Sequence, residues 1–216
     1  MKRLIGVLFS GILAGIMISI GGGVFLAIKG TSLIGASFLF SLGLFMIISL
    51  KLHLYTGKVG YIFENKKSFL LDLLITYIGN IIGVVVSGYS LRLTRLDNLI
   101  EVSNKLVETK VNDNLLSLFI LAIFCGFLIF LAVEVQKKDV PGIFKFAAIV
   151  LPITVFLVTG YEHSIADAFY FSASNAWNFK SIIRLIVISI GNGVGSILLW
   201  AMLRFYEKHI NKNKTN

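Results

Sequence analysis

Six long apolar segments constrain the fold of this chain more than any other feature of its sequence. They lie near residues 4–28, 33–54, 69–91, 115–136, 142–160 with an irregular continuation to 177, and 181–205. A helix needs about 20 mainly apolar residues to cross the hydrocarbon core of a bilayer. A water-soluble domain of 216 residues with 56% hydrophobic and 14% charged residues would expose large apolar patches. The sequence therefore predicts an all-α membrane protein with six transmembrane helices, surrounded by membrane lipids.

The distribution of Lys and Arg predicts the orientation. Both termini and the short loops on their side of the membrane carry more Lys and Arg than the opposite side. Because positive charge is retained in the cytoplasm, we expect cytoplasmic N- and C-termini in the cell membrane. The net charge of +9 does not indicate nucleic acid as a partner, since the basic residues do not form one amphipathic stripe.

Two motifs recur in the same order in the two halves of the chain. Leu54-Tyr55-Thr56-Gly57 is echoed by Leu157-Val158-Thr159-Gly160, and Gly79-Asn80-Ile81-Ile82-Gly83 by Gly191-Asn192-Gly193-Val194-Gly195. Such internal similarity is typical of transporters built from repeats, and three crossings per half make the repeats inverted. We expect one transmembrane domain, 1–216, with repeat one at about 1–91, a linker at 92–114, repeat two at 115–205 and a cytoplasmic tail at 206–216.

The repeated Thr-Gly pairs predict breaks in the second and fifth helices, at Thr56-Gly57 and Thr159-Gly160. Non-helical backbone at membrane depth is tolerated only where it is buried in protein or lines a water-filled cavity. Interrupted helices at matching positions of two repeats indicate a binding site near the midplane.

Ionisable side chains follow the second break, within an otherwise apolar region. His163 is flanked by Glu162 and Ser164 where the helix restarts. A charge at the bilayer centre costs at least about 2.5–3.5 kcal/mol, so such residues face the protein interior and are candidates for function. The exposed N–H groups of a restarting helix attract anions. We therefore expect a polar route that favours anions, with His163 at its centre.

Three other polar residues are open to two interpretations each. Lys145 either snorkels to the cytoplasmic interface or faces the route and attracts anions. Asn80 and Asn192 either form interhelical hydrogen bonds or line the pore.

The segments Leu54-Tyr55-Thr56-Gly57 and Gly160-Tyr161-Glu162-His163-Ser164-Ile165-Ala166, with the two Gly-Asn-x-x-Gly motifs, resemble those of formate/nitrite transporters. The resemblance implies a homopentamer of aquaporin-like protomers that move small monovalent anions such as formate, nitrite or hydrosulfide. It also implies roles for individual residues: a central site of His163, Thr56 and Glu162, anion attraction by Lys145, constrictions at Phe40, Leu44, Leu54, Tyr55 and Phe156, and pore support by Asn80 and Asn192. The chain departs from the family where it has Asp167 in place of the usual Asn, and His53 and Lys58 in place of common Glu and Asn.

These features lead to a hypothesis for transport. Bare charge in an apolar constriction is costly, so the anion would gain a proton at the His163–Thr56 site and pass as a neutral acid. The alternative is an aquaporin-like channel for neutral solutes, although neither break carries Asn-Pro-Ala. We expect no enzyme activity, no metal and no cofactor, because no Ser-His or paired-Asp arrangement appears on facing spans.

Overall fold

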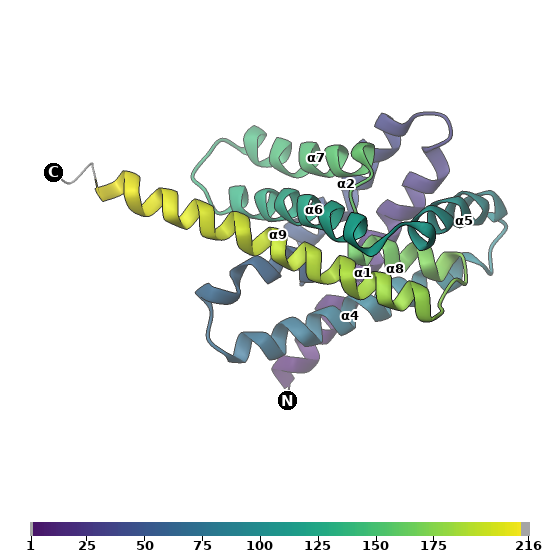
Figure 1. Ribbon diagram of the computed structural model, residues 1–216, viewed down its shortest axis with the longest axis horizontal. Coiled ribbons are helices and arrows are strands. Elements are labelled where there is room, and N and C mark those ends of the chain that lie inside the picture. Colours follow the sequence, from purple (N-terminus) through teal and green to yellow (C-terminus); the bar gives the residue numbers. More distant parts are fainter. Residues whose placement is uncertain (1, 213–216) are drawn as a thin grey trace.

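The fold is shown in Figure 1 as a computed structural model that describes residues 2–212. Over this range the chain forms helices and contains no β-strand. The helices are α1 (Lys2–Ile28), α2 (Leu33–Ser49), α3 (Tyr55–Lys58), the 3₁₀ helix η1 (Val59–Glu64), α4 (Ser68–Leu91), α5 (Asp97–Asn112), α6 (Leu115–Gln136), α7 (Gly142–Thr159), α8 (Ser164–Ala173) and α9 (Phe179–Lys212).

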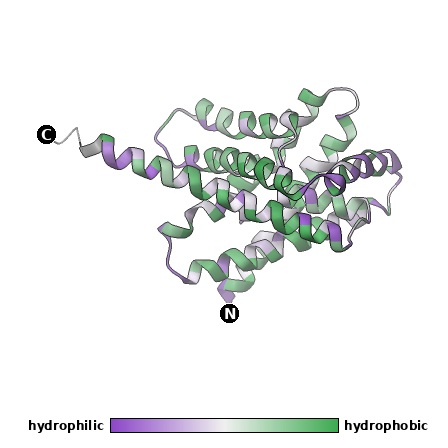
Figure 2. Cartoon of the chain, viewed as in Figure 1, coloured by the Kyte–Doolittle hydropathy of each residue, from purple (hydrophilic) through white to green (hydrophobic). Residues whose placement is uncertain are grey.

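Five of the described helices are long and apolar enough to cross a membrane, namely α1, α4, α6, α7 and α9. The apolar helix α2 is shorter, with 17 residues. In Figure 2, hydrophobic residues cover most of these helices, while hydrophilic ones gather on α5, near the N-terminus and at the C-terminal end of α9. Large apolar side chains such as Phe9, Ile34 and Leu151 are exposed. Such exposure would be unfavourable in water and is typical of helices that lie in a membrane.

The second apolar segment is interrupted, but at residues other than Thr56-Gly57. The chain is non-helical between the end of α2 at Ser49 and the start of α3 at Tyr55, so Thr56 and Gly57 lie inside α3. The predicted position of this break is therefore wrong. Lys51 ends α2 with a left-handed φ of 54°, and the N–H of Leu52 donates to the carbonyl of Ile47 at 2.8 Å. This left-handed end is a common way to terminate a helix, although glycine usually occupies the left-handed position.

The fifth apolar segment is interrupted in a corresponding way. Helix α7 ends at Thr159, Gly160 has a left-handed φ of 75°, and α8 begins at Ser164. The N–H of Tyr161 donates to the carbonyl of Phe156 at 2.9 Å, which closes the end of α7. Lys51 and Gly160 thus play the same part at the two breaks.

The segment 92–114, expected only as a polar linker, contains the amphipathic helix α5. Its buried residues Leu99, Ser103 and Val107 recur every fourth position and form one face. This face packs on α8, where the hydroxyl of Ser103 donates to the carbonyl of Tyr170 at 3.1 Å. Figure 1 places α5 at the end of the molecule opposite the C-terminal end of α9.

The two halves of the chain make matching helix contacts. Helix α1 packs on α4 as α6 packs on α9, and α2 lies against α7. Small residues allow the close approach of α1 and α4: a Cβ on Gly15 would lie only 3.0 Å from the Cα of Gly83. The short elements after the breaks, α3 and α8, are held among these pairs.

Candidate functional site

Asn80 and Asn192 hold the two breaks with equivalent hydrogen bonds. The Oδ1 of Asn80 accepts from the N–H of Tyr55 at 2.8 Å, and its Nδ2 donates to the carbonyls of His53 and Gly11, both at 2.9 Å. Asn80 is completely buried, so its amide replaces water for backbone groups that the break leaves without helical partners.

Asn192 repeats this pattern in the second half. Its Oδ1 accepts from the N–H of Ser164 at 3.0 Å, and its Nδ2 donates to the carbonyls of Glu162 at 2.8 Å and Ala122 at 2.9 Å. Of the two interpretations left open by the sequence, the observed bonds favour interhelical hydrogen bonding for both asparagines.

These bonds correct the alignment of the two motifs around the breaks. The amide contacts equate His53 with Glu162 and Tyr55 with Ser164, so Leu54 corresponds to His163. The match between Thr56-Gly57 and Thr159-Gly160 is therefore wrong. These pairs lie on opposite sides of their breaks, because the first break uses Lys51 rather than a glycine.

Thr56 and His163 meet where α3 and α8 begin. The Thr56 Oγ1 and the His163 Nε2 are 2.9 Å apart, and both residues are buried. The His163 Nδ1 accepts from the N–H of Ala166 at 3.1 Å and so caps α8. Because Nδ1 is an acceptor, the neutral ring carries its proton on Nε2 and donates it to Thr56. The Thr56 hydroxyl has no acceptor for its own proton within residues 2–212.

An apolar layer lies beside this polar pair. Its side chains are almost fully buried and are contributed by Phe40, Leu44, Leu54 and Phe156. The ring of Phe156 stacks on His163 at 5.8 Å and meets Phe40 edge-on at 5.9 Å. This layer excludes water from the neighbourhood of the histidine.

Tyr55, predicted as part of the constriction, lies elsewhere. Its hydroxyl donates to the carbonyl of Ser189 at 3.1 Å, and its ring packs 5.0 Å from that of Tyr77. It lines a groove with residues of α4 and α9 and borders neither cavity described below. The placement of Tyr55 in the constriction is therefore corrected. Successive helical residues point in different directions, so Tyr55 does not face the same way as Leu54 or Thr56.

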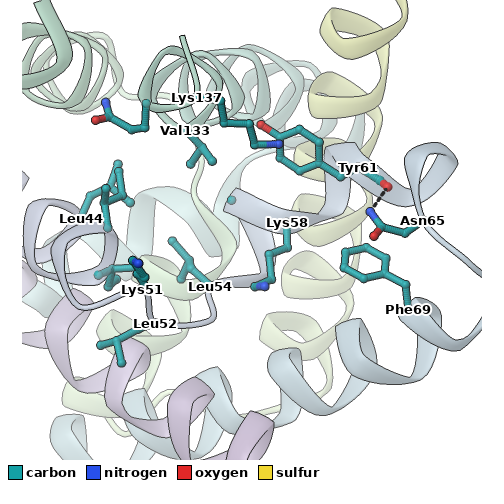
Figure 3. Close-up of a pocket in the computed structure, with 14 residues that line it drawn as sticks. Leu44, Lys51, Leu52, Leu54, Lys58, Tyr61, Asn65, Phe69, Val133 and Lys137 are labelled. Carbon is teal, nitrogen blue, oxygen red and sulfur yellow. Dashed lines mark hydrogen bonds between the residues drawn. The ribbon is translucent and has the colours of Figure 1, made fainter. Parts of the chain in front are cut away.

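The larger of the two cavities beside the apolar layer has a volume of about 420 Å³. Leu44 and Leu54 form the part shared with the layer, and the lysines lining it are Lys51, Lys58 and Lys137. Figure 3 shows the lysines distributed around this hollow, with Lys137 beside Tyr61. The Lys137 Nζ lies 3.2 Å from the centre of the Tyr61 ring, an arrangement that favours a cation. This cavity is therefore apolar at its base and cationic at its rim.

The smaller cavity has a volume of about 80 Å³ and is lined by His163 and Phe156. Lys29, Lys110, Asp167 and Tyr170 also line it.

The two cavities open toward opposite ends of α1. Lys29, which follows α1, borders the smaller cavity. At the other end of α1, Arg3 pairs with Asp72 of α4 at 2.6 Å. Phe69, one turn from Asp72 on the same helix, borders the larger cavity. The apolar layer and the Thr56–His163 pair thus separate hollows that approach from opposite faces.

Lys110 of α5 joins the site through two carboxylates. Its Nζ lies 2.9 Å from the Asp167 Oδ1 and also contacts the Glu162 Oε2. Burial would lower the pKa of Lys110, but the two carboxylates raise this pKa above its usual value. Lys110 was not among the site residues expected from the sequence. The signal was present, because Lys110 follows Val107 by three positions and so shares the buried face of α5.

Lys145, expected to attract anions, lies half-buried in the first turn of α7. It borders neither of the two cavities, which other lysines line instead. Within residues 2–212, no cluster of three or more His, Cys, Asp or Glu side chains could hold a metal ion.

Comparisons with known proteins place this geometry in context. A family model described as formate/nitrite transporter matches residues 1–206. A formate-nitrite transporter from Plasmodium falciparum is 28% identical over 88% of this chain and 72% of its own length. An uncharacterized transporter from Saccharomyces cerevisiae is 27% identical over 77% of this chain, which spans only 29% of the yeast protein.

Solved structures share the fold. A pentameric formate channel with formate bound is 22% identical, and the match has a TM-score of 0.82 and covers 96% of this chain and 98% of that chain. An ion channel described as an FNT family member also gives a TM-score of 0.82, at 21% identity, over 94% of this chain and 90% of that chain.

Proposed function

The chain belongs to the formate/nitrite transporter family and is a multi-pass membrane protein, and on this basis we propose that it conducts small monovalent anions of weak acids across the cell membrane. Formate, nitrite and hydrosulfide are the anions of this class that we consider. Related proteins are described as a formate-nitrite transporter and a formate channel, which supports the proposal.

The observation that carries the proposal is the arrangement of two cavities on opposite sides of one thin apolar layer. The larger cavity ends at Leu44 and Leu54, and the smaller one reaches Phe156 and His163. A solute that crosses must leave one cavity, pass the apolar side chains and meet the Thr56–His163 pair. Such a path suits a small solute that can lose its charge on the way.

Lys51 and Lys58 at the larger cavity and Lys29 at the smaller one would concentrate anions. Lys51 and Lys58 have no carboxylate within ion-pair distance among residues 2–212, so their charges are available to a solute. In the low dielectric of the apolar layer, the same anion would be strongly disfavoured. We therefore propose that the anion gains a proton beside the layer and crosses as the neutral acid.

His163 and Thr56 would form the central site. The Thr56 hydroxyl can donate to an anion or accept from an acid, and Glu162 lies beside His163 on the α7–α8 break. A second proton on His163 would replace the bond that its Nδ1 accepts from Ala166 with a repulsive contact between two N–H groups. His163 would thus bind the solute and share its Nε2 proton without giving it away.

The whole-chain architecture is also part of the proposal. The matched asparagine bonds and helix contacts support two inverted repeats with six crossings in one transmembrane domain, with α2–α3 and α7–α8 as broken helices. Cytoplasmic termini would place the larger cavity on the cytoplasmic side and the smaller one outside. We further propose a homopentamer of aquaporin-like protomers, supported by the fold of the pentameric formate channel.

The test is uptake of radiolabelled formate by proteoliposomes that contain wild type or His163→Phe. We expect uptake by the wild type above protein-free liposomes, and a loss of at least about tenfold in the variant, as for removal of a hydrogen bond to an ion. Equal uptake and equal pH dependence in both would contradict the central site. Rapid glycerol-driven swelling without formate uptake would favour the neutral-solute channel instead.

A further inference from the structure

A buried group of two carboxylates and one lysine, Glu162, Asp167 and Lys110, adjoins the smaller cavity and contains more negative charge than Lys110 can compensate. The ammonium of Lys110 contacts carboxylate oxygens of both Glu162 and Asp167. The exposed fractions of these side chains are 11% for Lys110, 7% for Glu162 and 2% for Asp167. With both acids ionised, this group of three would carry one uncompensated negative charge in a site from which solvent is largely excluded.

One proton removes that imbalance. Two carboxylates that share a buried site repel each other when both are ionised, so the group is neutral overall when one of them holds a proton. With a single proton, the group consists of one ammonium, one carboxylate and one neutral carboxyl group. The position of that proton then determines whether it can be donated to a solute in the cavity.

Asp167 is the better position for the proton. It lines the smaller cavity, whereas Glu162 does not. The Asp167 Oδ1 faces Lys110, while its buried Oδ2 has no hydrogen-bond partner among the residues that the structure describes. A protonated Oδ2 would therefore offer the cavity a donor for which only the Glu162 carboxylate competes.

Tyr170 supplies a further donor at the same cavity. Its hydroxyl is buried and also has no partner within residues 2–212. Buried polar groups are almost always paired, so two unpaired groups around one small cavity indicate a polar ligand. Two O–H donors at one cavity suit an anion, which accepts hydrogen bonds and offers none.

We infer that Asp167 is the proton donor for the permeating anion and that Tyr170 binds this anion in the smaller cavity. This inference rests on the proposed function. The Asp167 Oδ2–H bond breaks as an O–H or S–H bond forms on the anion. The neutral acid moves on past His163, and the Asp167 carboxylate left behind is stabilised by Lys110 until a proton from external water replaces the one transferred.

The other groups near Asp167 fit this role. The titratable and charged side chains that face it come from the end of α1, from α5, α6 and α8, and from the break: Lys29, Lys110, Cys125, Tyr170, Glu162 and His163. Among them, only Glu162 competes with Asp167 as an acid. The hydrogen bond from Ala166 keeps the His163 Nδ1 without a proton.

The experiment measures uptake of radiolabelled formate by proteoliposomes as the external pH rises. Asp167→Asn keeps a carbonyl oxygen for Lys110 and removes the acid proton. We expect its uptake at neutral pH to be at least about tenfold below wild type, as for loss of a positioned proton donor. The uptake that remains in the variant should be proportional to the concentration of neutral formic acid in bulk water. It should therefore fall about tenfold for each unit of rising pH, more steeply than uptake by the wild type.

The control is Asp97→Asn, which makes the same chemical change at an exposed position of α5 and should leave uptake unchanged. If Asp167→Asn does not reconstitute into liposomes, Asp167→Glu provides the test. This variant keeps a carboxylic acid, so its formate uptake should retain the shallower pH dependence of the wild type. Uptake by Asp167→Glu that follows the concentration of formic acid in bulk water would overturn the inference. A wild-type rate and pH profile in Asp167→Asn would also overturn it. Absence of formate uptake by the wild type itself would instead contradict the proposed function.

Discussion

At the scale of single residues, the site depends on a hydrogen bond between two side chains from distant parts of the chain. Thr56 and His163 are 107 positions apart in sequence and meet because each follows a break that an asparagine holds in place. The ring of His163 is fixed on its other side by the N–H of Ala166. A rigid imidazole next to a hydroxyl with a free proton can bind a solute whose charge changes.

A substitution at Thr56 tests the part played by its hydroxyl. Thr56→Val keeps the shape of the side chain and removes the hydroxyl, so we expect formate uptake to fall about tenfold or more. Thr56→Ser keeps the hydroxyl and should retain most of the uptake. Uptake by proteoliposomes at a fixed pH gives the comparison, and a Val variant as active as the Ser variant would show that the hydroxyl is not used.

The residues that the sequence singled out lie at different distances from the site. His163, Thr56, Leu54 and Phe156 come together. A charge in an apolar segment pointed to His163, and the family resemblance pointed to the other three. Lys110 was not predicted as a site residue, because its contacts with Glu162 and Asp167 join segments more than fifty positions apart. Charge at one position of a polar linker does not reveal which buried acid it will meet.

At the scale of secondary-structure elements, the breaks depend on asparagines rather than on the Thr-Gly pairs. We expect Asn192→Leu to destabilise the protein by at least about 2 kcal/mol, because it leaves the N–H of Ser164 and the carbonyls of Glu162 and Ala122 unpaired. Thermal unfolding in detergent measures the effect. Asn98→Leu, on the exposed side of α5, is the matched control, and equal melting temperatures for the two variants would contradict the assigned role.

A second element-scale prediction concerns the contact between η1 and α9. The Glu64 Oε1 accepts from the Trp200 indole at 2.7 Å and from the Arg204 Nε at 2.6 Å. Burial would raise the pKa of Glu64, but these bonds lower it below the usual 4.5. The contact therefore stabilises the fold above that usual pKa, and the stabilisation is lost as the pH falls through the lowered value.

The measurement compares the melting temperature of the wild type with that of Glu64→Gln. The wild type should melt higher at neutral pH, and the difference should disappear in acid, once Glu64 is protonated in the folded state. A difference that stays constant as the pH falls would show that the charge of Glu64 does not matter to this contact.

The sequence predicted some of the helices and helix ends but not others. The apolar segments predicted the long helices well, because length and hydrophobicity are local properties. The position of the first break was wrong because α2 ends with a left-handed lysine, Lys51, where the second half has Gly160. A search for glycine finds Gly57 instead. Helix α5 was not assigned because its apolar face is narrow and interrupted by Ser103.

At the scale of the whole molecule, two cavities with lysines at their borders approach each other across a thin apolar layer. The lysines attract anions to the cavities, and the apolar layer between the cavities excludes charged solutes. Together they select solutes that can change their charge. Weak-acid anions can do this by taking up a proton, whereas the anions of strong acids cannot.

The most direct test compares nitrite with nitrate, which have similar size and the same charge but differ in the strength of their acids. Proteoliposomes with the wild-type chain should take up nitrite faster as the external pH is lowered. Nitrate uptake should stay at the level of protein-free liposomes at every pH. Equal rates for the two anions would contradict the claim that the solute crosses the apolar layer as a neutral acid.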